Sequence, residues 1–432
     1  MTFLYTPLLY LFLPVLLIRL VWRGFKNPAY WHRWNERFGY IQHLEQPIDV
    51  WIHAVSVGEV RAAEPIVNAL IDQATTIRVL VTTMTPTGSA QARQCFGDRV
   101  IHCYAPYDFP AAVRRFIEKC RPSLAIFMET EMWPNIIRQC SRRAIPLLFA
   151  NVRLSEKSFA RYQRIVGFMG PVLRLASGFA VQTSADAERL KRLGAREESI
   201  RVTGSIKFDV KVPASLAEVA QVLRREWGSD RPVWIAASTH EGEDETVLKV
   251  FAELKKHHPN LLLVIVPRHP ERFTAVARLC RREGYKTVLR SERAGPLRDD
   301  VDIFVGDSMG ELTLFYAASD VAFVGGSLVP VGGHNVLEPC ALGLPVVFGQ
   351  HMFNFHEISK RTLARGAGIQ VSGEAQLTAA VDRILQDPNL RFKIGESGKA
   401  FVEENKGALH RTLGMLMEYI PEFSFQQNNV PG

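Results

Sequence analysis

Short apolar runs alternate with amphipathic segments along most of the chain. In the first half the runs are Asp49–Val55, Ile77–Thr83, Leu124–Met128, Pro146–Ala150 and Gly178–Gln182. Runs of this length without strict alternation are typical of parallel strands that are buried on both faces. Helical stretches separate them, for example 60–73 and 110–119. Repeated strand–helix order predicts a parallel α/β sheet with right-handed crossovers.

A polar, proline-containing stretch at 207–215 interrupts this pattern, which then restarts. The later runs are 232–237, 261–266, 302–306, 321–325 and 345–348. Because 432 residues exceed what one hydrophobic core usually supports, we expect two domains, at 23–210 and 211–425. Both should be Rossmann-like doubly wound domains, with a working cleft at the carboxyl ends of their strands.

The amino terminus differs from this pattern. From Phe3 to Ile18 every residue is apolar, aromatic, Thr or Pro, and Arg19, Arg23 and Lys26 follow. A signal peptide carries its positive charge before the apolar core, so this order favours an uncleaved membrane anchor over residues 1–22. The basic flank predicts that the rest of the chain lies on the cytoplasmic side. The run is shorter than the roughly 20 residues of a comfortable span, so whether it spans the membrane or lies in its interface stays open.

The composition limits the class of binding partner but does not identify one. The net charge of +8 predicts an anionic partner, such as a phosphorylated substrate or an acidic membrane surface. Nucleic acid is not expected, because the chain has no recognition module and no basic run with interleaved aromatic residues. The six cysteines are scattered without metal-type spacing, which indicates reduced thiols rather than a disulfide framework or a zinc site.

Three motifs of the first predicted domain carry candidate chemistry. Glu59 ends the motif HAVSVGE after the first strand, where a carboxylate can stabilise a helix amino terminus or take a proton from an acceptor hydroxyl. Glu129 and Glu131 alternate just past the strand 124–128, where they either form ion pairs or take part in the chemistry. Lys207, in GSIKFD, could meet a donor phosphate or be simply solvated.

In the second predicted domain, every candidate motif follows a strand. The segment 236–243 offers Ser238 or Thr239 as a helix cap, and Arg268 of PRHPERF should point into the cleft. Ser308 in GDSMGEL offers an anion site at a helix start, and Glu338 in GGHNVLEP could accept from ribose hydroxyls. Because these loops converge on one sheet edge, they predict a nucleotide-binding face.

Two absences exclude other nucleotide chemistries. The chain lacks a GxxxxGK[ST] loop, so a P-loop nucleotidase is not expected. Its one DxD motif, Asp300–Asp302, enters a strand from the amino-terminal side and is interpreted as a turn. We therefore expect neither a metal requirement nor a cofactor.

At these residues the sequence resembles the 3-deoxy-D-manno-octulosonic acid (Kdo) transferases of lipopolysaccharide assembly, which have the GT-B glycosyltransferase fold. The resemblance covers nearly the whole chain, through the anchor and the motifs HAVSVGE, METEMWPN, GSIKFD, PRHPERF, GDSMGEL and GGHNVLEP. It implies a CMP-Kdo donor, a tetraacyl disaccharide lipid A precursor as acceptor, and the cytoplasmic face of the bacterial inner membrane as location.

The resemblance also implies roles for individual residues. Glu59 matches the proton acceptor, and Glu129 with Lys207 matches the pair that stabilises the transition state. The segments that match the family's CMP contacts comprise Pro267, Arg268, Ser308, Met309, Gly310, Asn335, Val336, Leu337 and Glu338.

Two alternatives stay open on the residues alone. One is a nucleotide-sugar epimerase of GT-B architecture, which the anchor disfavours. The other is a non-catalytic membrane protein that binds nucleotide sugars, which the carboxylates of Glu59 and METE disfavour. The sequence does not determine how many Kdo residues are transferred, how Glu129 and Glu131 divide their roles, or the oligomeric state.

Overall fold

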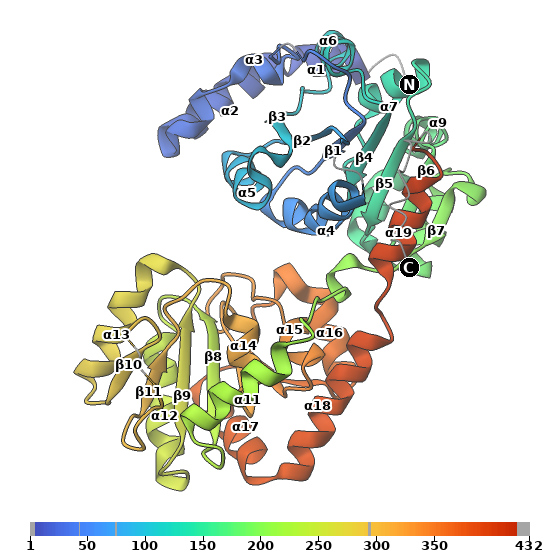
Figure 1. Cartoon of the computed structure of the whole chain (residues 1–432). Coiled ribbons are helices and arrows are strands. Elements are labelled where there is room, and N and C mark those ends of the chain that lie inside the picture. Colours follow the sequence, from blue (N-terminus) through green and yellow to red (C-terminus); the bar gives the residue numbers. More distant parts are fainter. Residues whose placement is uncertain (1–4, 43, 74–75, 293–294, 421–432) are drawn as a thin grey trace, which may run out of the picture. The chain divides into compact units, whose positions relative to one another are not determined.

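The computed structural model describes residues 5–42, 44–73, 76–292 and 295–420. The chain divides into two compact units: the first comprises 1–209 together with 407–432, and the second comprises 210–406. Figure 1 shows that each unit contains its own sheet and helices. Residues 1–4 of the predicted anchor and 421–425 of the predicted second domain lie outside the described residues.

The first unit is built on a seven-stranded parallel sheet with the order β3-β2-β1-β4-β5-β6-β7. The order reverses direction between β1 and β4, as in doubly wound folds. Its strands are β1 (Val50–His53), β2 (Val79–Thr83), β3 (Ile101–Tyr104), β4 (Leu124–Met128), β5 (Leu147–Val152), β6 (Gly178–Val181) and β7 (Ile200–Val202).

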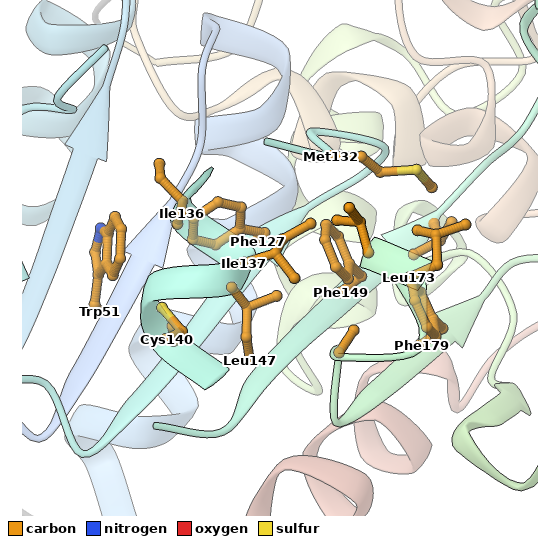
Figure 2. Packing of buried hydrophobic residues seen from close by; sticks show 14 of the residues in the cluster. Trp51, Phe127, Met132, Ile136, Ile137, Cys140, Leu147, Phe149, Leu173 and Phe179 are labelled. Carbon is orange, nitrogen blue, oxygen red and sulfur yellow. The ribbon is translucent and has the colours of Figure 1, made fainter. Parts of the chain in front are cut away.

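Helices connect these strands: α4 (Val57–Gln73), α5 (Pro86–Phe96), α6 (Pro110–Cys120), α7 (Pro134–Arg142), α8 (Glu156–Gln163), α9 (Val166–Leu173) and α10 (Ser184–Arg192). On one face of the sheet a row of aromatic side chains forms the core (Figure 2). Phe127 is the register partner of Phe149, and Phe149 of Phe179, so their rings follow one another across β4, β5 and β6. This row keeps the strand ends that carry the predicted motifs in fixed register.

Between residues 5 and 42, the part that the structure describes before the first sheet, the chain forms four helices: α1 (Tyr5–Leu11), α2 (Leu13–Lys26), the 3₁₀ helix η1 (Pro28–Trp31) and α3 (Trp34–Arg37). Among the described residues, no single helix has both the length and the apolar composition to cross a bilayer. Taken together, α1 and α2 meet those two criteria, but they are bent by 49° where they join.

The second unit repeats the architecture with the order β10-β11-β9-β8-β12-β13-β14, again entirely parallel. Its strands are β8 (Val233–Thr239), β9 (Leu262–Pro267), β10 (Thr287–Leu289), β11 (Ile303–Val305), β12 (Val321–Val324), β13 (Val346–Phe348) and β14 (Gly368–Gln370). The prediction of two doubly wound parallel-sheet domains is therefore confirmed.

The helices of the second unit are α11 (Leu216–Trp227), α12 (Asp244–His257), α13 (Phe273–Arg282), α14 (Leu312–Ala317), α15 (Leu337–Ala341), α16 (His356–Ala364), α17 (Glu374–Gln386) and α18 (Pro388–Glu403). Trp234 and Phe251 are fully buried in the core between α12 and the central strands. This packing fixes the loops that follow β8 and β9.

At the carboxyl terminus the structure differs from the predicted domain boundary. Helix α19 (Ala408–Met417) belongs to the first unit, whereas the prediction placed residues up to 425 in the second. The Asp209 carboxylate accepts the backbone N–H groups of Gly407 and Leu409, both at 2.6 Å. Arg201 of β7 donates to Glu418 at 2.7 Å. After the second unit the chain therefore returns to the first unit, because α19 and the residues beside it contact Asp209 and β7.

Candidate functional site

Glu59 lies at the carboxyl edge of the first sheet, in the first turn of α4. Its Oε2 accepts the backbone N–H of Val55 at 2.8 Å, and its Oε1 accepts the hydroxyl of Ser56 at 3.1 Å. The Glu59 N–H in turn reaches Ser56 Oγ at 3.4 Å, an arrangement close to a capping box. Glu59 is only 7% exposed. The helix-end role that the sequence left open is therefore present, and it holds the carboxylate in one orientation.

The pKa of Glu59 is raised to about 8: burial is the largest cause and the charges of Glu131 and Glu129 add to it, while the hydrogen bonds from Val55 and Ser56 oppose the shift. A carboxyl group desolvated beside two like charges keeps its proton to higher pH. A group whose pKa lies near neutral pH can both take up and release a proton under physiological conditions, which is the property that a general base needs.

Glu129 and Glu131 follow β4 and face different partners. Glu129 adopts a left-handed backbone (φ +55°), and its N–H donates to Ala150 O at 2.9 Å. Glu131 accepts from Trp133 Nε1 at 2.8 Å, and burial raises its pKa, with a further contribution from Glu129. The left-handed backbone at Glu129 means that the two residues do not lie in an extended strand, yet the charges of both act on Glu59.

Lys207 lies in the 3₁₀ helix η4 (Ile206–Phe208) of the first unit. Burial lowers the pKa of its amino group, the charge of Glu129 opposes this, and Arg153 lowers the pKa further. Lys207 and Glu129 therefore interact electrostatically. The structure thus brings Glu59, Glu129 and Lys207 into one set of interacting charges on the first unit.

His53, which opens the HAVSVGE motif, is fully buried. Its Nδ1 lies 2.9 Å from Thr82 Oγ1, and its ring meets that of Trp133 edge-on, with the centroids 5.6 Å apart. Burial lowers the pKa of His53 to about 3, so its imidazole is neutral at physiological pH. Of the two titratable residues in this motif, only Glu59 can exchange a proton near pH 7.

The predicted nucleotide segments follow four neighbouring strands of the second unit, in the order β11, β9, β8 and β12. Because these strands are parallel, the loops at their carboxyl ends share one edge of the sheet. Pro267 is buried as the last residue of β9. The backbone N–H of Arg268 donates to Thr239 O at 3.0 Å, which ties the loop after β9 to the end of β8.

The segment from Ser308 to Gly310 does not form the predicted helix start. Helix α14 begins only at Leu312 and has six residues. The Ser308 hydroxyl donates to Glu311, which forms an ion pair with Arg290 at 2.8 Å. Met309 is 62% exposed and Gly310 has a φ of +85°, so this turn presents backbone and an apolar side chain. The helix start therefore lies later in the chain than predicted, and the Ser308 hydroxyl is engaged within the loop; the anion site at this turn stays a prediction.

The segment from Asn335 to Glu338 leads into α15, which begins at Leu337 with Val336 as its N-cap residue. Asn335 Oδ1 accepts the N–H of Leu337 at 3.1 Å, and Asn335 Nδ2 donates to Glu338 Oε1 at 3.0 Å. Val336 and Leu337 are fully buried. Asn335 and Glu338, in contrast, are partly exposed and can be reached by a ligand.

Glu243, at the start of α12, organises this edge in a way that the sequence analysis did not predict. Its fully buried carboxylate accepts backbone N–H groups of the glycine-rich loop after β12, namely those of Gly326 at 2.6 Å, Ser327 at 3.0 Å and Leu328 at 2.9 Å. It also accepts the N–H of His240 at 3.0 Å. The prediction of Ser238 or Thr239 as helix cap was wrong, since both belong to β8 and Glu243 is the N-cap residue of α12.

A pair of histidines, also not predicted, lies on the same loops. His240 Nε2 and His334 Nε2 are 2.8 Å apart, while the ring centroids are 5.1 Å apart and the planes differ by 6°. The rings thus meet edge to edge, and one Nε2–H donates to the other. Burial lowers the pKa of His240, as do His269, Arg272 and Arg268, while Glu243 opposes this. Each histidine follows a strand, which was the signal available in the sequence.

The DxD carboxylates are engaged in ion pairs. Asp300 accepts from Lys286 at 2.8 Å and Arg298 at 3.1 Å, and Asp302 accepts from Lys255 and from the Lys286 N–H. They precede β11, as predicted. Within the part of the chain that the structure describes, no group of three or more His, Cys, Asp or Glu residues is arranged to hold a metal ion.

Comparison with known families places this geometry in context. Residues 32–210 match the family model described as 3-deoxy-D-manno-octulosonic-acid transferase (kdotransferase). Residues 236–401 match the model described as glycosyl transferases group 1. The two matches fall on the first and second units respectively.

Two relatives agree with the family models. The chain is 42% identical over 421 residues to a 3-deoxy-D-manno-octulosonic acid transferase of Haemophilus influenzae, covering 97% of this chain and 98% of that one. It is 36% identical to the enzyme of that name from Bordetella pertussis, covering 86% and 87%. A UDP-GlcNAc 2-epimerase from Neisseria meningitidis is similar in fold alone, with 14% identity, a TM-score of 0.56 and coverage of 86% and 100%. The chain belongs to the 3-deoxy-D-manno-octulosonic acid transferase family of glycosyltransferases.

Proposed function

We propose that the protein transfers Kdo from CMP-Kdo to a hydroxyl of the tetraacyl disaccharide lipid A precursor, with Glu59 as the general base. One observation carries the proposal: the Glu59 carboxylate is buried, fixed by Val55 and Ser56, and has its pKa raised to about 8. Family membership supports the class of reaction, and the sequence resemblance supplies the donor and the acceptor.

In the proposed step the acceptor hydroxyl attacks the anomeric carbon of Kdo and gives its proton to Glu59. A new C–O bond forms to the acceptor, the C–O bond to the phosphate of CMP breaks, and its electron pair leaves with CMP. Positive charge develops on the sugar ring meanwhile. Glu129 favours that charge, and Lys207, with which it interacts, offsets the negative charges of the donor.

The donor is proposed to bind at the edge of the second sheet. Arg268 would pair with the phosphate or the Kdo carboxylate, and Glu338 would accept from ribose hydroxyls. Of the other matched residues, Ser308, Met309, Gly310 and Asn335 are at least partly exposed and would complete the contacts, whereas the buried residues Pro267, Val336 and Leu337 would shape the loops that carry them. The Asn335–Glu338 hydrogen bond supports this assignment, because it holds the Glu338 carboxylate in one orientation.

The proposed location is the cytoplasmic face of the bacterial inner membrane, where a lipid acceptor is available. The net charge of +8 suits both an anionic membrane surface and the phosphorylated lipid A precursor that is the proposed acceptor. Neither alternative function gains support from a specific observation: the similarity to an epimerase is one of fold, and a protein that only binds nucleotide sugars has no need of the raised pKa at Glu59.

The direct test is incubation of the purified chain with CMP-Kdo and the lipid A precursor, followed by mass spectrometry of the lipid. We expect the lipid mass to increase by one or more Kdo residues and CMP to be released. A run in EDTA tests the expected metal independence. Release of CMP without Kdo on the lipid would contradict the proposed acceptor, and intact CMP-Kdo would contradict the proposed donor.

A further inference from the structure

Helix α2 exposes a continuous apolar face. Val15, Ile18, Trp22 and Phe25 recur at intervals of three and four residues and are 59%, 69%, 57% and 73% exposed. We refer to these four residues as the apolar stripe. The two buried residues of α2 are Leu20 and Gly24. An amphipathic helix normally buries its apolar side against its own protein, so an apolar face turned outward indicates an apolar partner outside the chain.

Basic residues flank this stripe. Arg19, Arg23 and Lys26 each follow a stripe residue by one position, and Lys26 Nζ lies 4.5 Å from the centroid of the Trp22 ring. A helix with apolar and aromatic residues on one side and basic residues beside them is typical of helices that lie in a membrane interface containing anionic lipid. The charge and the aromatic content thus favour a lipid surface over a second protein.

Both ends of the α1–α2 pair are attached to the first unit. At the start, the Tyr5 hydroxyl donates to Asp108 at 2.9 Å, and its ring packs against Phe168 of α9. Asp108 is 5% exposed and also accepts from the N–H groups of Asn135 and Ile136. Tyr5 is therefore bound to a preformed, buried acceptor. Figure 1 shows α1 at the side of the unit that carries α6 and α7.

After α2 the chain returns to the same unit. Trp31 of η1 donates to Val21 O at 3.2 Å and occupies the space that a side chain at Gly24 would need. Arg37 of α3 is buried, donates to Met84 O at 3.1 Å and stacks on Tyr104. The chain thus leaves and re-enters the first unit on either side of the pair.

These attachments argue against a span. Helix α2 has 14 residues, and at 1.5 Å per residue it is about 21 Å long, against a hydrocarbon core of about 30 Å. Only α1 and α2 in line could cross, and α1 is bent by 49° from α2 and held at Tyr5. To span, the pair would have to straighten and release Tyr5 from Asp108.

We propose that α1 and α2 lie in the plane of the membrane, with the apolar stripe among the acyl chains and both helix ends on the side of the first unit. Leu11 and Phe12, 71% and 58% exposed at the bend, continue the apolar face. The inference rests on the proposed membrane location and decides what the sequence left open: the anchor does not cross. It would hold the first unit against the surface that contains the lipid acceptor.

The topology can be tested with the full chain carrying an epitope tag at either end. Inverted and right-side-out vesicles from the inner membrane of expressing bacteria are digested with protease from outside. We expect both tags to be cut in inverted vesicles and protected in right-side-out ones. The carboxyl-terminal tag is the matched control for orientation. An amino-terminal tag cut only in right-side-out vesicles would overturn the proposal.

The role of the stripe is tested by flotation of the purified chain with vesicles of phosphatidylethanolamine and phosphatidylglycerol. Val15→Asp should weaken vesicle binding by at least about tenfold, because it places a charge where the proposal puts an apolar side chain among the acyl chains. The control is Val222→Asp, the same change at a 46% exposed valine of α11, which should leave binding unchanged. Both variants should keep wild-type activity on detergent-dispersed acceptor.

The outcomes separate the two proposals. If the wild-type chain does not float with vesicles, the membrane location fails and the in-plane anchor fails with it. If it floats but the amino-terminal tag lies on the far side, only the in-plane anchor fails. If Val15→Asp floats normally but converts a dimer into a monomer in light scattering without lipid, the stripe binds a second copy instead, and the proposal is wrong.

Discussion

The carboxylate of Glu59 accepts a 2.8 Å hydrogen bond from the backbone N–H of Val55, four residues earlier in the chain. This bond closes the turn between β1 and α4 around a carboxyl group whose pKa is raised to about 8. The same contact therefore fixes the position of the proposed base and stabilises the helix start on which it lies. Structure and chemistry can be separated by substitutions that keep the shape of the side chain.

Glu59→Gln should abolish most transfer while keeping the fold. The amide oxygen can still accept from Val55, but the side chain can no longer take a proton, and a positioned base contributes on the order of 10²- to 10⁴-fold in rate. Turnover of CMP-Kdo measures the loss, and CMP affinity by calorimetry is the control, because the donor segments lie on the second unit. Normal turnover in this variant would exclude Glu59 as the base.

The rate should depend on pH with a limb set by Glu59. A general base works as the carboxylate, so kcat/KM should rise as pH increases through about 8. Glu131→Gln removes one of the negative charges that raise the pKa of Glu59, so the limb should move to lower pH. A pH profile of kcat/KM for both proteins measures this. An unchanged limb in Glu131→Gln would show that its charge does not act on the base.

The free energy of unfolding should fall as pH rises, because the pKa of Glu59 is raised in the folded chain. The pKa of Glu59 is about 8 in the folded chain and 4.5 as the ordinary value for Glu, so between these pH values the folded state binds a proton that the unfolded state has lost. Its contribution is complete below pH 4.5 and is lost as pH rises through about 8. Glu59→Gln lacks this dependence and should gain at least about 1.4 kcal/mol relative to wild type between pH 5 and pH 9. Urea unfolding at both pH values measures it; a constant difference would contradict the raised pKa.

Glu243→Gln should loosen the glycine-rich loop of the second unit. Each carboxylate oxygen accepts two backbone N–H groups, and an amide can accept with one oxygen only, so two of the four donors lose their acceptor and face an NH2 group instead. We expect a loss of about 1.5–3 kcal/mol in unfolding free energy and weaker CMP binding. Denaturant unfolding and calorimetry measure the two effects. Glu241→Gln, an exposed neighbour in the same turn, is the control.

Arg268→Ala should raise the KM for CMP-Kdo by about 10- to 100-fold, the value of a charge-assisted hydrogen bond to an anion. Arg298→Ala is the matched control, because Arg298 is an arginine of the same unit whose side chain is 84% exposed and lies beside Asp300. Steady-state kinetics at saturating acceptor distinguish the two. An equal change in both variants would indicate a general effect of net charge rather than donor binding at Arg268.

Much of the site could be predicted because it depends on order along the chain. A buried strand followed by small residues and a carboxylate places Glu59 at a sheet edge, and the same logic places Arg268 after β9.

The strands that the pattern failed to predict were β3, β7, β10 and β14, which are the four edges of the two sheets. Edge strands are covered on fewer sides, so β7, β10 and β14 lack the apolar run that marks a central strand.

The sequence by itself thus determined the two parallel sheets, the family and the strand ends that carry the candidate residues, because each follows from periodicity and motifs over short stretches. Only the tertiary structure decided what depends on distant partners. The pKa of Glu59 is set by burial and by charges some 70 residues away, and Glu243 holds a loop more than 80 residues later. The same holds for the bond from Tyr5 to Asp108, which places the amino-terminal helices along the first unit. Local pattern specifies an element, whereas burial and electrostatic environment arise only when elements meet.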